Sequence, residues 1–246
     1  MEIKLRCSNV VVTGGGSGIG FAIARALIAE GAKVTIIGRN TEKLERAKAE
    51  INNTNLFIYP WDVQNSDNLP QRFIDIASKS GQVIDGFVNN AGIYKGVGGW
   101  GVWKETDEIW DSTFNINLKA PIFITRAMAT YMHDNKIHGN ICNVSSVTGT
   151  REITSAYGAS KLSLISMTKG MAREVANMGI VINGVAPGVT SSEINGNRTG
   201  VYKAHAIGRI IEAEEIAKCV LFMMSEVGSI IIGDTLIADG GYLSVH

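Results

Sequence analysis

The chain contains few cysteines and no residue arrangement typical of a structural metal site. Only 3 of its 246 residues are cysteine, and Cys7, Cys142 and Cys219 lie far apart with no Cys-x-x-Cys spacing. This pattern excludes a disulfide-stabilised secreted domain and the common zinc modules, whose ligands recur at short fixed spacings. We therefore expect reduced, buried cysteines and no metal.

The sequence also has no excess of either charge, since 23 lysines and arginines balance 23 aspartates and glutamates. Such a chain has no overall field that would draw it to nucleic acid or to an anionic membrane. It lacks an apolar run long enough to span a bilayer, and its first residues contain no apolar signal core. We expect a cytoplasmic protein whose partner is a small molecule, with no nucleic-acid or membrane partner.

What the chain does contain is a regular alternation of strand and helix patterns. Strands are predicted over residues 9–13, 33–37, 55–59, 83–88, 139–145, 180–185 and 235–237. Helices are predicted over residues 21–30, 41–51, 66–80, 106–131, 155–178 and 212–225, with Pro121 bending or splitting the fourth. This alternation predicts an α/β fold in which one doubly wound parallel sheet has helices on both faces. No linker or repeat divides residues 1–246, so we expect a single domain.

A glycine-rich turn joins the first strand to the first helix. Gly14, Gly18 and Gly20 are its key glycines, and their spacing does not fit the G-x-G-x-x-G fingerprint. Glycines at a strand-to-helix junction let backbone amides approach a phosphate, which the helix dipole favours. The turn therefore predicts a phosphate-binding loop, and an ordinary flexible loop is the alternative.

Further residues of chemical interest also follow the ends of predicted strands. They are Arg39, Asp62, the segment 89–92, the pair Ser145 and Ser146, and Pro187 with Gly188. In an open parallel sheet, ligands bind beyond the carboxyl ends of the strands. We expect these residues to line one cleft.

Tyr157 and Lys161 lie four residues apart on a predicted helix, and so one turn apart on the same face. A cation close to a phenol favours the phenolate and lowers the pKa of the tyrosine. The pair predicts general acid–base chemistry on an alcohol or a ketone. A helix with one aromatic and one basic residue on its surface is the alternative.

These features occur together, in one order, over nearly the whole chain. They are Thr-Gly-x-x-x-Gly-x-Gly from Thr13, Asn-Asn-Ala-Gly from Asn89, Asn117, the serine pair, Tyr157-x-x-x-Lys161 and Pro187-Gly188. The combination resembles the short-chain dehydrogenase/reductase family. That resemblance implies a Rossmann-type domain and a nicotinamide-dependent oxidoreductase that interconverts a carbonyl and a secondary alcohol.

The resemblance also implies roles for four side chains. Tyr157 would be the general acid–base, and Lys161 would lower its pKa and bond the nicotinamide ribose. Ser146 would polarise the substrate carbonyl, and Asn117 would hold a water in a proton relay behind the lysine. Ser145 and Asn115 remain rivals, because Ser146 stands only eleven positions before Tyr157 and Asn115 precedes Asn117 by two.

The residues after the second predicted strand bear on the choice of cofactor. An acidic residue at this place favours NAD, but this chain has Gly38 followed by Arg39. A guanidinium pairs well with the additional phosphate of NADP. We therefore predict that the cofactor is NADP, and NAD is the alternative. The alternative for Arg39 is a solvated surface residue. The further cofactor contacts that the resemblance implies are Gly14, Ser17, Gly18, Ile19, Gly20, Asp62, Val63, Asn89, Ala91, Gly92, Pro187, Gly188 and Ser192.

Of all the features considered, the sequence says least about the substrate. Two segments should shape its site: residues 93–104, with Trp100 and Trp103, and the loop 189–210, which would close as a lid. Ketoacyl thioesters, sugars or polyols and small ketones all remain open. The resemblance also implies a homo-oligomer, either a tetramer or a dimer, joined through segments 162–167 and 230–237. Alternative functions are a dinucleotide-sensing regulator without chemistry and a methyltransferase on a similar sheet.

Overall fold

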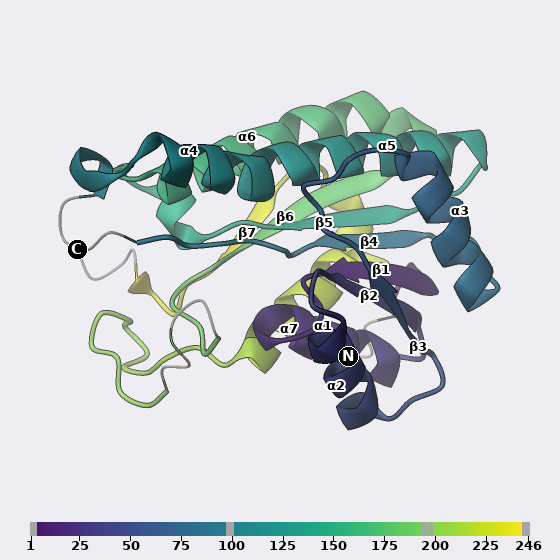
Figure 1. Ribbon diagram of the computed structural model, residues 1–246, viewed down its shortest axis with the longest axis horizontal. Helices are drawn as coiled ribbons and strands as arrows, with labels where there is room; N and C mark the ends of the chain where they lie inside the picture. Colours follow the sequence, from purple (N-terminus) through teal and green to yellow (C-terminus); the bar gives the residue numbers. More distant parts are fainter. Residues whose placement is uncertain (1–3, 97–100, 193–195, 197–198, 243–246) are drawn as a thin grey trace.

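A computed structural model describes residues 4–96, 101–192, 196 and 199–242 of the chain (Figure 1). Seven strands form one sheet in the order β3-β2-β1-β4-β5-β6-β7, and every neighbouring pair in it is parallel. The strands are β1 (Asn9–Thr13), β2 (Lys33–Gly38), β3 (Leu56–Pro60), β4 (Gly86–Asn89), β5 (Asn140–Val144), β6 (Val181–Pro187) and β7 (Thr235–Ala238). The predicted doubly wound parallel sheet is confirmed.

Helices cover both faces of the sheet (Figure 1). On one face lie α1 (Gly18–Ala29), α2 (Thr41–Ile51) and α7 (Ala213–Met223). On the other face lie α3 (Leu69–Ser80), α4 (Asp107–Phe114), α5 (Ala120–Asp134) and α6 (Ala156–Val175). None of the helices in the described parts of the chain is long and apolar enough to cross a membrane.

The alternation of side chains along each strand produces two separate hydrophobic cores. In β1, Val10 and Val12 pack in the core under α1 and α7, while Val11 packs in the opposite core with α3 and α5. All residues of β1 are buried, which is typical of a strand that has helices on both sides. The continuous β-branched run therefore forms a central strand.

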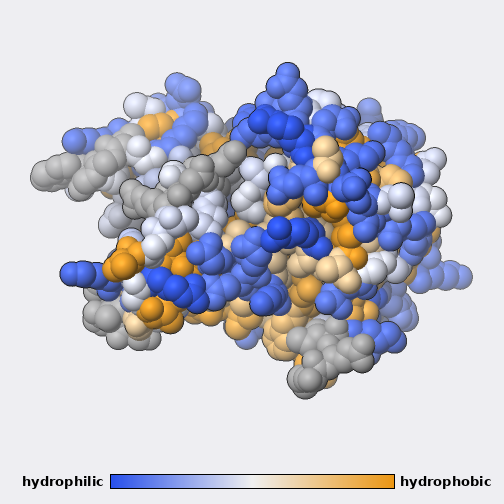
Figure 2. All heavy atoms as spheres, turned by 90° about the horizontal axis from the view of Figure 1, so that it is seen from below, coloured by the Kyte–Doolittle hydropathy of each residue, from blue (hydrophilic) through white to orange (hydrophobic). Residues whose placement is uncertain are grey.

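The outer surface of α2 is polar. Helix α2 buries only Leu44 and Ala47, and its charged residues face outward. Figure 2, which looks onto the lower side of the molecule, shows hydrophilic residues over most of this face and apolar residues in smaller areas between them.

Two predicted helices differ in their boundaries or pitch. The helix expected over 66–80 begins at Leu69, with Pro70 in its first turn, where a missing N–H does no harm. The helix expected over 106–131 is not split at Pro121. Its pitch changes one turn earlier, in a π-helical turn at Asn115–Lys119, and Pro121 lies in the first turn of α5. Because Pro121 carries no N–H, the regular α-helical pattern cannot run through it unchanged.

A chain of buried polar side chains joins the sheet to α5 and α6. Asn89 donates from Nδ2 to Asn143 Oδ1 (2.8 Å) and to Thr125 Oγ1 (3.0 Å). Asn143 in turn donates from Nδ2 to Thr168 Oγ1 (2.9 Å), and Thr168 Oγ1 donates to the Leu164 carbonyl oxygen (2.7 Å). Since buried amides are stable only when they are paired, this network fixes where both helices lie on the sheet.

We predict that Thr168→Val lowers the free energy of unfolding by about 1–3 kcal/mol, because it leaves the buried Asn143 amide without an acceptor. The matched control is Thr130→Val. Thr130 donates to the Arg126 carbonyl oxygen in the same way (3.1 Å) but is exposed, so its replacement should change stability by less than about 0.5 kcal/mol. Urea unfolding measures both, and equal losses would contradict the network's role.

Candidate functional site

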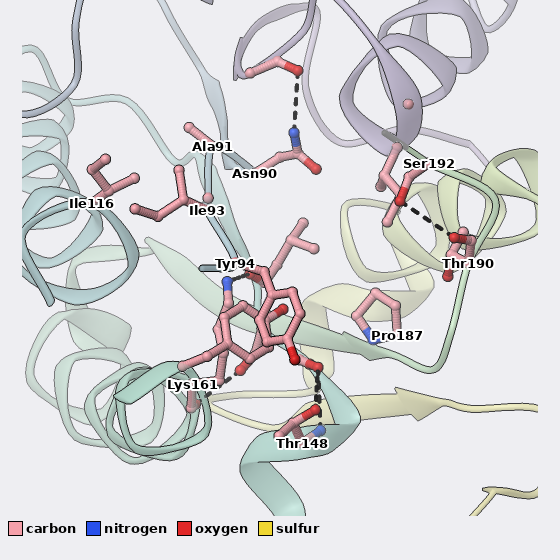
Figure 3. A pocket seen from close by; sticks show the side chains of 18 of the residues that line it. Asn90, Ala91, Ile93, Tyr94, Ile116, Thr148, Lys161, Pro187, Thr190 and Ser192 are labelled. Atoms are coloured by element: carbon pink, nitrogen blue, oxygen red, sulfur yellow. Dashed lines mark hydrogen bonds between the residues drawn. The ribbon is translucent and has the colours of Figure 1, made fainter. Parts of the chain in front are cut away.

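A cavity of about 920 Å³ runs along the carboxyl ends of the strands. It contains most of the residues that the sequence predicts for a site: Gly14, Ser17, Gly18, Ile19, Arg39, Asp62, Val63, Ala91, Gly92, Ser145, Ser146, Tyr157, Lys161, Pro187, Gly188 and Ser192. Figure 3 shows how they surround the space, with Asn90 and Ala91 across from Thr148 and with Lys161 across from Pro187 and Ser192. The predicted cleft is present.

The glycine-rich turn forms one end of the cavity. Gly14 and Gly18 adopt φ angles of +68° and +54°, which favour glycine. Ser17 precedes α1 but makes no side-chain capping hydrogen bond, so the first N–H groups of α1 have no side-chain partner there. A helix N-terminus of this kind attracts an anion.

Gly20 does not line the cavity, and its contact with the cofactor stays a prediction. A Cβ at Gly20 would overlap the carbonyl oxygen of Gly14. The glycine is needed because the first turn of α1 lies directly against the loop backbone. It therefore shapes the loop without touching the cavity.

The ends of β2 and β3 supply a cation and a carboxylate. Arg39 is exposed, and no carboxylate of the described residues lies within ion-pair distance of it. Asp62 accepts from the Gln64 backbone N–H at 3.1 Å, and Val63 is buried beside it. Arg39 thus has a free guanidinium at the edge of the cavity.

Asn89 is the second predicted cofactor residue that does not line this cavity. Along β4, Phe87 and Asn89 face the α3 and α5 side of the sheet, where Asn89 bonds Thr125 and Asn143. The next residue, Asn90, lines the cavity instead and donates from Nδ2 to the Thr13 carbonyl oxygen (3.0 Å). The strand's two-residue period puts these neighbouring side chains on opposite faces, and the contact of Asn89 with a cofactor stays a prediction.

The serine pair at the end of β5 has two distinct environments. Ser145 Oγ donates to the Lys161 carbonyl oxygen at 2.9 Å, so its proton is already used. Ser146 Oγ accepts from the Thr148 backbone N–H (3.2 Å) and donates to Thr148 Oγ1 (3.2 Å), and it lies close enough to Tyr157 to lower the pKa of the phenol. Of the two hydroxyls, the one on Ser146 lies beside the phenol.

The first turn of α6 positions Tyr157. Ser155 Oγ accepts from the Gly158 N–H (3.1 Å), and Glu105 Oε2 accepts from the Ala156 N–H (2.7 Å). One turn later, Lys161 Nζ donates to the Val144 carbonyl oxygen (3.0 Å) and lies 5.8 Å from the centre of the Tyr157 ring. The predicted proximity of the two side chains is therefore present.

The pKa of Tyr157 is shifted in the opposite direction to the one predicted. Burial raises the pKa of Tyr157 above its ordinary value, the hydrogen bond with Ser146 lowers it in part, and the nearby Tyr94 raises it further. Burial also lowers the pKa of Lys161 to about 8. The pKa of Tyr157 thus lies above the range that the sequence suggested, because loss of hydration on burial is the largest cause of its shift.

Asn117 lies behind the cavity and does not line it. It is fully buried, accepts from the Ile93 N–H (2.8 Å) and donates to the Ile93 carbonyl oxygen (2.9 Å). A Cβ added to Gly92 would lie 3.3 Å from Asn117 Oδ1 and 3.6 Å from Lys161 Nζ, so the amide and the ammonium both lie against Gly92. The rival Asn115 is exposed.

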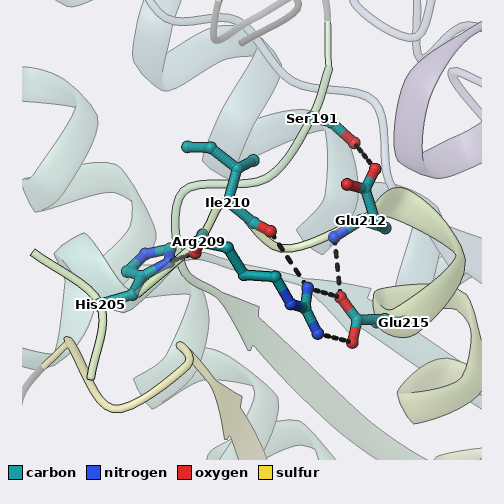
Figure 4. A network of polar contacts seen from close by, with 6 residues as sticks. All are labelled: Ser191, His205, Arg209, Ile210, Glu212 and Glu215. Carbon is teal, nitrogen blue, oxygen red and sulfur yellow. Dashed lines mark hydrogen bonds and ion pairs between the residues drawn. The ribbon is translucent and has the colours of Figure 1, made fainter. Parts of the chain in front are cut away.

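The loop 189–210 is held to the start of α7 (Figure 4). His205, 2% exposed, accepts from the Val189 N–H at Nε2 (3.3 Å), so its Nδ1–H donates to the Arg209 carbonyl oxygen (2.8 Å). Arg209 pairs with both oxygens of Glu215 (2.6 and 2.7 Å) and holds the pKa of this carboxyl down to about 2. The described part of the loop is thus anchored at its base.

The two tryptophans do not form a wall of the cavity in the described structure. Trp103 is 85% exposed and does not line it, and Trp100 lies outside the described residues. Tyr94 from the same segment does, with its ring edge-to-face against Tyr157 at 5.2 Å between centres. The lining residues Asn90, Ile93, Val189 and Thr190 lie in segments that the sequence assigned to the site, whereas sequence reasoning missed Glu105, Ile116, Thr148 and Arg151.

The site fits a dinucleotide cofactor. Its volume is within the usual range for ligand pockets, the uncapped N-terminus of α1 suits a pyrophosphate, and the cavity continues from there to Ser146 and Tyr157. The glycine turn would hold the phosphates, Arg39 and Asp62 would lie near the adenosine end, and Lys161 would lie near the reacting end.

Comparison with known proteins agrees with this geometry. A family model described as short chain dehydrogenase matches residues 8–201. The chain is 34% identical to the 3-oxoacyl-[acyl-carrier-protein] reductase FabG of Rickettsia bellii, over 99% of this chain and 100% of that protein. It is 33% identical to the acetoacetyl-CoA reductase of Shinella zoogloeoides, over 96% and 98%.

A solved structure described as ElxO with NADP bound superposes with a TM-score of 0.86 at 30% identity, covering 97% of this chain and 99% of that one. The family match spans well over half of the chain, and the relatives cover nearly all of it. The resemblance inferred from the sequence is therefore confirmed: the chain belongs to the short-chain dehydrogenase/reductase family of NAD(P)-dependent oxidoreductases.

Proposed function

We propose that the chain is an NADP(H)-dependent oxidoreductase that interconverts a carbonyl and a secondary alcohol, with Tyr157 as the general acid–base. One observation carries this proposal. A single cavity is lined by the glycine turn at one end and by Ser146, Tyr157 and Lys161 at the other. The relatives named as reductases and the NADP-bound structural neighbour support it.

The two hydroxyls would bind the substrate oxygen. Ser146 Oγ lies beside the Tyr157 phenol, whose pKa it lowers, so an oxygen placed between the two hydroxyls would receive a hydrogen bond from each. Because the phenol is protonated at neutral pH, it is suited to donate its proton to an oxygen that becomes an alkoxide during reduction. The bound nicotinamide would supply the hydride.

Lys161 would assist the proton transfer through its charge. Its pKa of about 8 keeps most of it protonated at pH 7. When Tyr157 gives up its proton, the ammonium favours the phenolate that remains. Asn117, directly behind the lysine, would connect this end of the cavity to the backbone of Ile93 and hold the water of a proton relay.

Arg39 and Gly38 support the choice of NADP over NAD. The guanidinium is exposed without a carboxylate partner among the described residues, and glycine at position 38 leaves no negative charge at the end of β2 to repel a phosphate. An arginine fork suits the additional phosphate of NADP.

We also propose a homo-oligomer. Leu162 on α6 is 47% exposed, Ile237 on β7 is 46% exposed, and Ile230 between α7 and β7 is 86% exposed. A second copy of the chain would cover these apolar side chains. A regulator that binds the cofactor without chemistry remains the alternative to the enzyme, since the same glycine turn would serve it.

For catalysis, we predict that Tyr157→Phe lowers kcat by about 10²–10⁴-fold with a panel of carbonyl compounds and NADPH, because only the proton donor is lost. Cofactor affinity, measured by nicotinamide fluorescence, should change little. Tyr131→Phe, which removes a hydroxyl from α5 outside the cavity, is the control and should keep full activity. Turnover that survives Tyr157→Phe would refute the assigned role.

For cofactor choice, we predict that Arg39→Gln lowers kcat/KM for NADPH by about 10–100-fold and leaves the value for NADH nearly unchanged, since a charged hydrogen bond contributes about 1.5–3 kcal/mol. Arg46→Gln, an exposed arginine on α2 outside the cavity, should leave both values unchanged. A wild-type preference for NADH would show that the assignment of Arg39 is incorrect.

For Lys161, the lowered pKa sets a dependence of stability on pH. In the unfolded chain the lysine pKa is about 10.4, so above pH 8 the unfolded chain binds more protons than the folded chain. Stability therefore rises with pH in this range, and Lys161 destabilises the fold least at high pH. The stability advantage of Lys161→Met over wild type should therefore shrink by roughly 2–3 kcal/mol between pH 7 and pH 10.

Urea unfolding at each pH measures this difference, and Lys169→Met, an exposed lysine on the same helix, is the control that should show no such trend. The raised pKa of Tyr157 acts above this window. A constant difference for Lys161→Met would mean that the lysine is hydrated in the folded protein.

A further inference from the structure

Arg151 lies at the reacting end of the cavity. It directly follows the short 3₁₀ turn Val147–Thr150, which begins after Ser146, and it precedes Tyr157 by six positions. The chain between the proposed carbonyl-binding serine and the proposed proton donor thus carries an arginine that lines the same cavity.

The guanidinium of Arg151 has no anionic partner among the described residues. It is exposed, and the ion pairs found in the described parts of the chain do not include it. Glu105 also lines this end, but its carboxylate accepts the Ala156 N–H at 2.7 Å and makes no ion pair with Arg151. The positive charge of Arg151 is therefore available to a ligand.

Tyr242 holds the guanidinium in place. Arg151 Nη1 donates to the Tyr242 hydroxyl at 2.8 Å, and the guanidinium carbon lies 4.9 Å from the centre of the Tyr242 ring. Tyr242 itself packs edge-on against the buried His205, with 6.0 Å between ring centres. An arginine positioned by a neutral phenol has lost part of its conformational freedom while most of its five N–H donors remain unused.

The other two cations that line the cavity have different positions. Arg39 follows β2 at the opposite end, and Lys161 is buried and donates to the Val144 carbonyl oxygen. Arg151 is thus the cation, among the described lining residues, that is placed to meet the far end of a substrate whose carbonyl lies at Ser146 and Tyr157.

We propose that the substrate is a carbonyl compound with an anionic group, a carboxylate or a phosphate monoester, which Arg151 binds. The inference rests on the proposed function and specifies its substrate class. Both anions match the flat donor fork of arginine, and each can accept two parallel hydrogen bonds from it.

The test compares charged carbonyl compounds with neutral counterparts of the same length. The panel contains short 2-, 3- and 4-oxo acids with their methyl esters, and dihydroxyacetone phosphate with dihydroxyacetone, assayed with NADPH. We expect wild-type kcat/KM to be at least about tenfold higher for an anion than for its neutral partner. The acids and the phosphate separate the two sources of charge.

In Arg151→Gln the ratio of charged to neutral kcat/KM should fall by about 10–100-fold, mainly through KM. The matched control is Arg126→Gln, since Arg126 is also exposed and lies over an aromatic ring, Phe123, at 4.6 Å but outside the cavity. Its ratio should equal that of wild type. Equal use of charged and neutral compounds by wild type, or equal ratios in the two variants, would overturn the inference.

A binding measurement separates this inference from the proposed function. Calorimetry with the protein loaded with oxidised NADP, which cannot reduce a carbonyl, should detect binding of the oxo acids of the panel to wild type and to Arg126→Gln, but not to Arg151→Gln. Anion binding without any turnover would contradict the oxidoreductase function and support the Arg151 site. Reduction of esters and acids alike, with no selective anion binding, would support the function and overturn the Arg151 site.

Discussion

The whole site depends on how the start of α6 is fixed to the end of β5. Two hydrogen bonds run between the same two segments: Lys161 Nζ donates to the Val144 carbonyl oxygen at 3.0 Å, and Ser145 Oγ donates to the Lys161 carbonyl oxygen at 2.9 Å. This reciprocal pair sets the rotation and height of α6 against the sheet, so that Tyr157, one turn earlier, meets Ser146. The buried amide network through Asn143 and Thr168 supports the same helix two turns further on. The position of α6 therefore results from paired buried polar groups, which would lose their hydrogen bonds if the helix moved.

Burial of Lys161 has an energetic consequence as well as a geometric one. Lys161 is only 4% exposed. Its ammonium group therefore loses hydration, and its pKa falls to about 8. The same surroundings raise the pKa of Tyr157. At neutral pH the site therefore holds a protonated phenol beside a lysine that is mostly protonated, so the phenol is present as a proton donor and not as a stored phenolate. This differs from the simple picture of a tyrosine already half ionised by its neighbour.

Most of the fold could be predicted from the sequence because β-branched runs, glycine turns and amphipathic helices all act locally. The site was predictable where a residue's place in a strand or turn determines which way it points, as for Gly14, Ser146 and Tyr157. The differences have two origins. Asn89 faces the α5 side because of the pleat of β4, whose register the sequence pattern did not define, and Gly20 packs against the backbone of the Gly14 loop, a contact that glycine spacing alone does not reveal. Arg151 could not be found, and Tyr94 could be assigned only through its segment 93–104, because their contacts with Tyr242 and Tyr157 join segments whose approach no local pattern encodes.

The central claim is that Ser146 and Tyr157 together bind the oxygen at which the proton is exchanged. The most direct measurement is an experimental structure of the protein with NADP and a carbonyl or alcohol ligand. The account predicts that the ligand oxygen lies within about 2.5–3.0 Å of both Ser146 Oγ and the Tyr157 phenol oxygen. A ligand oxygen bound by neither hydroxyl, with Tyr157 directed away from it, would contradict the account.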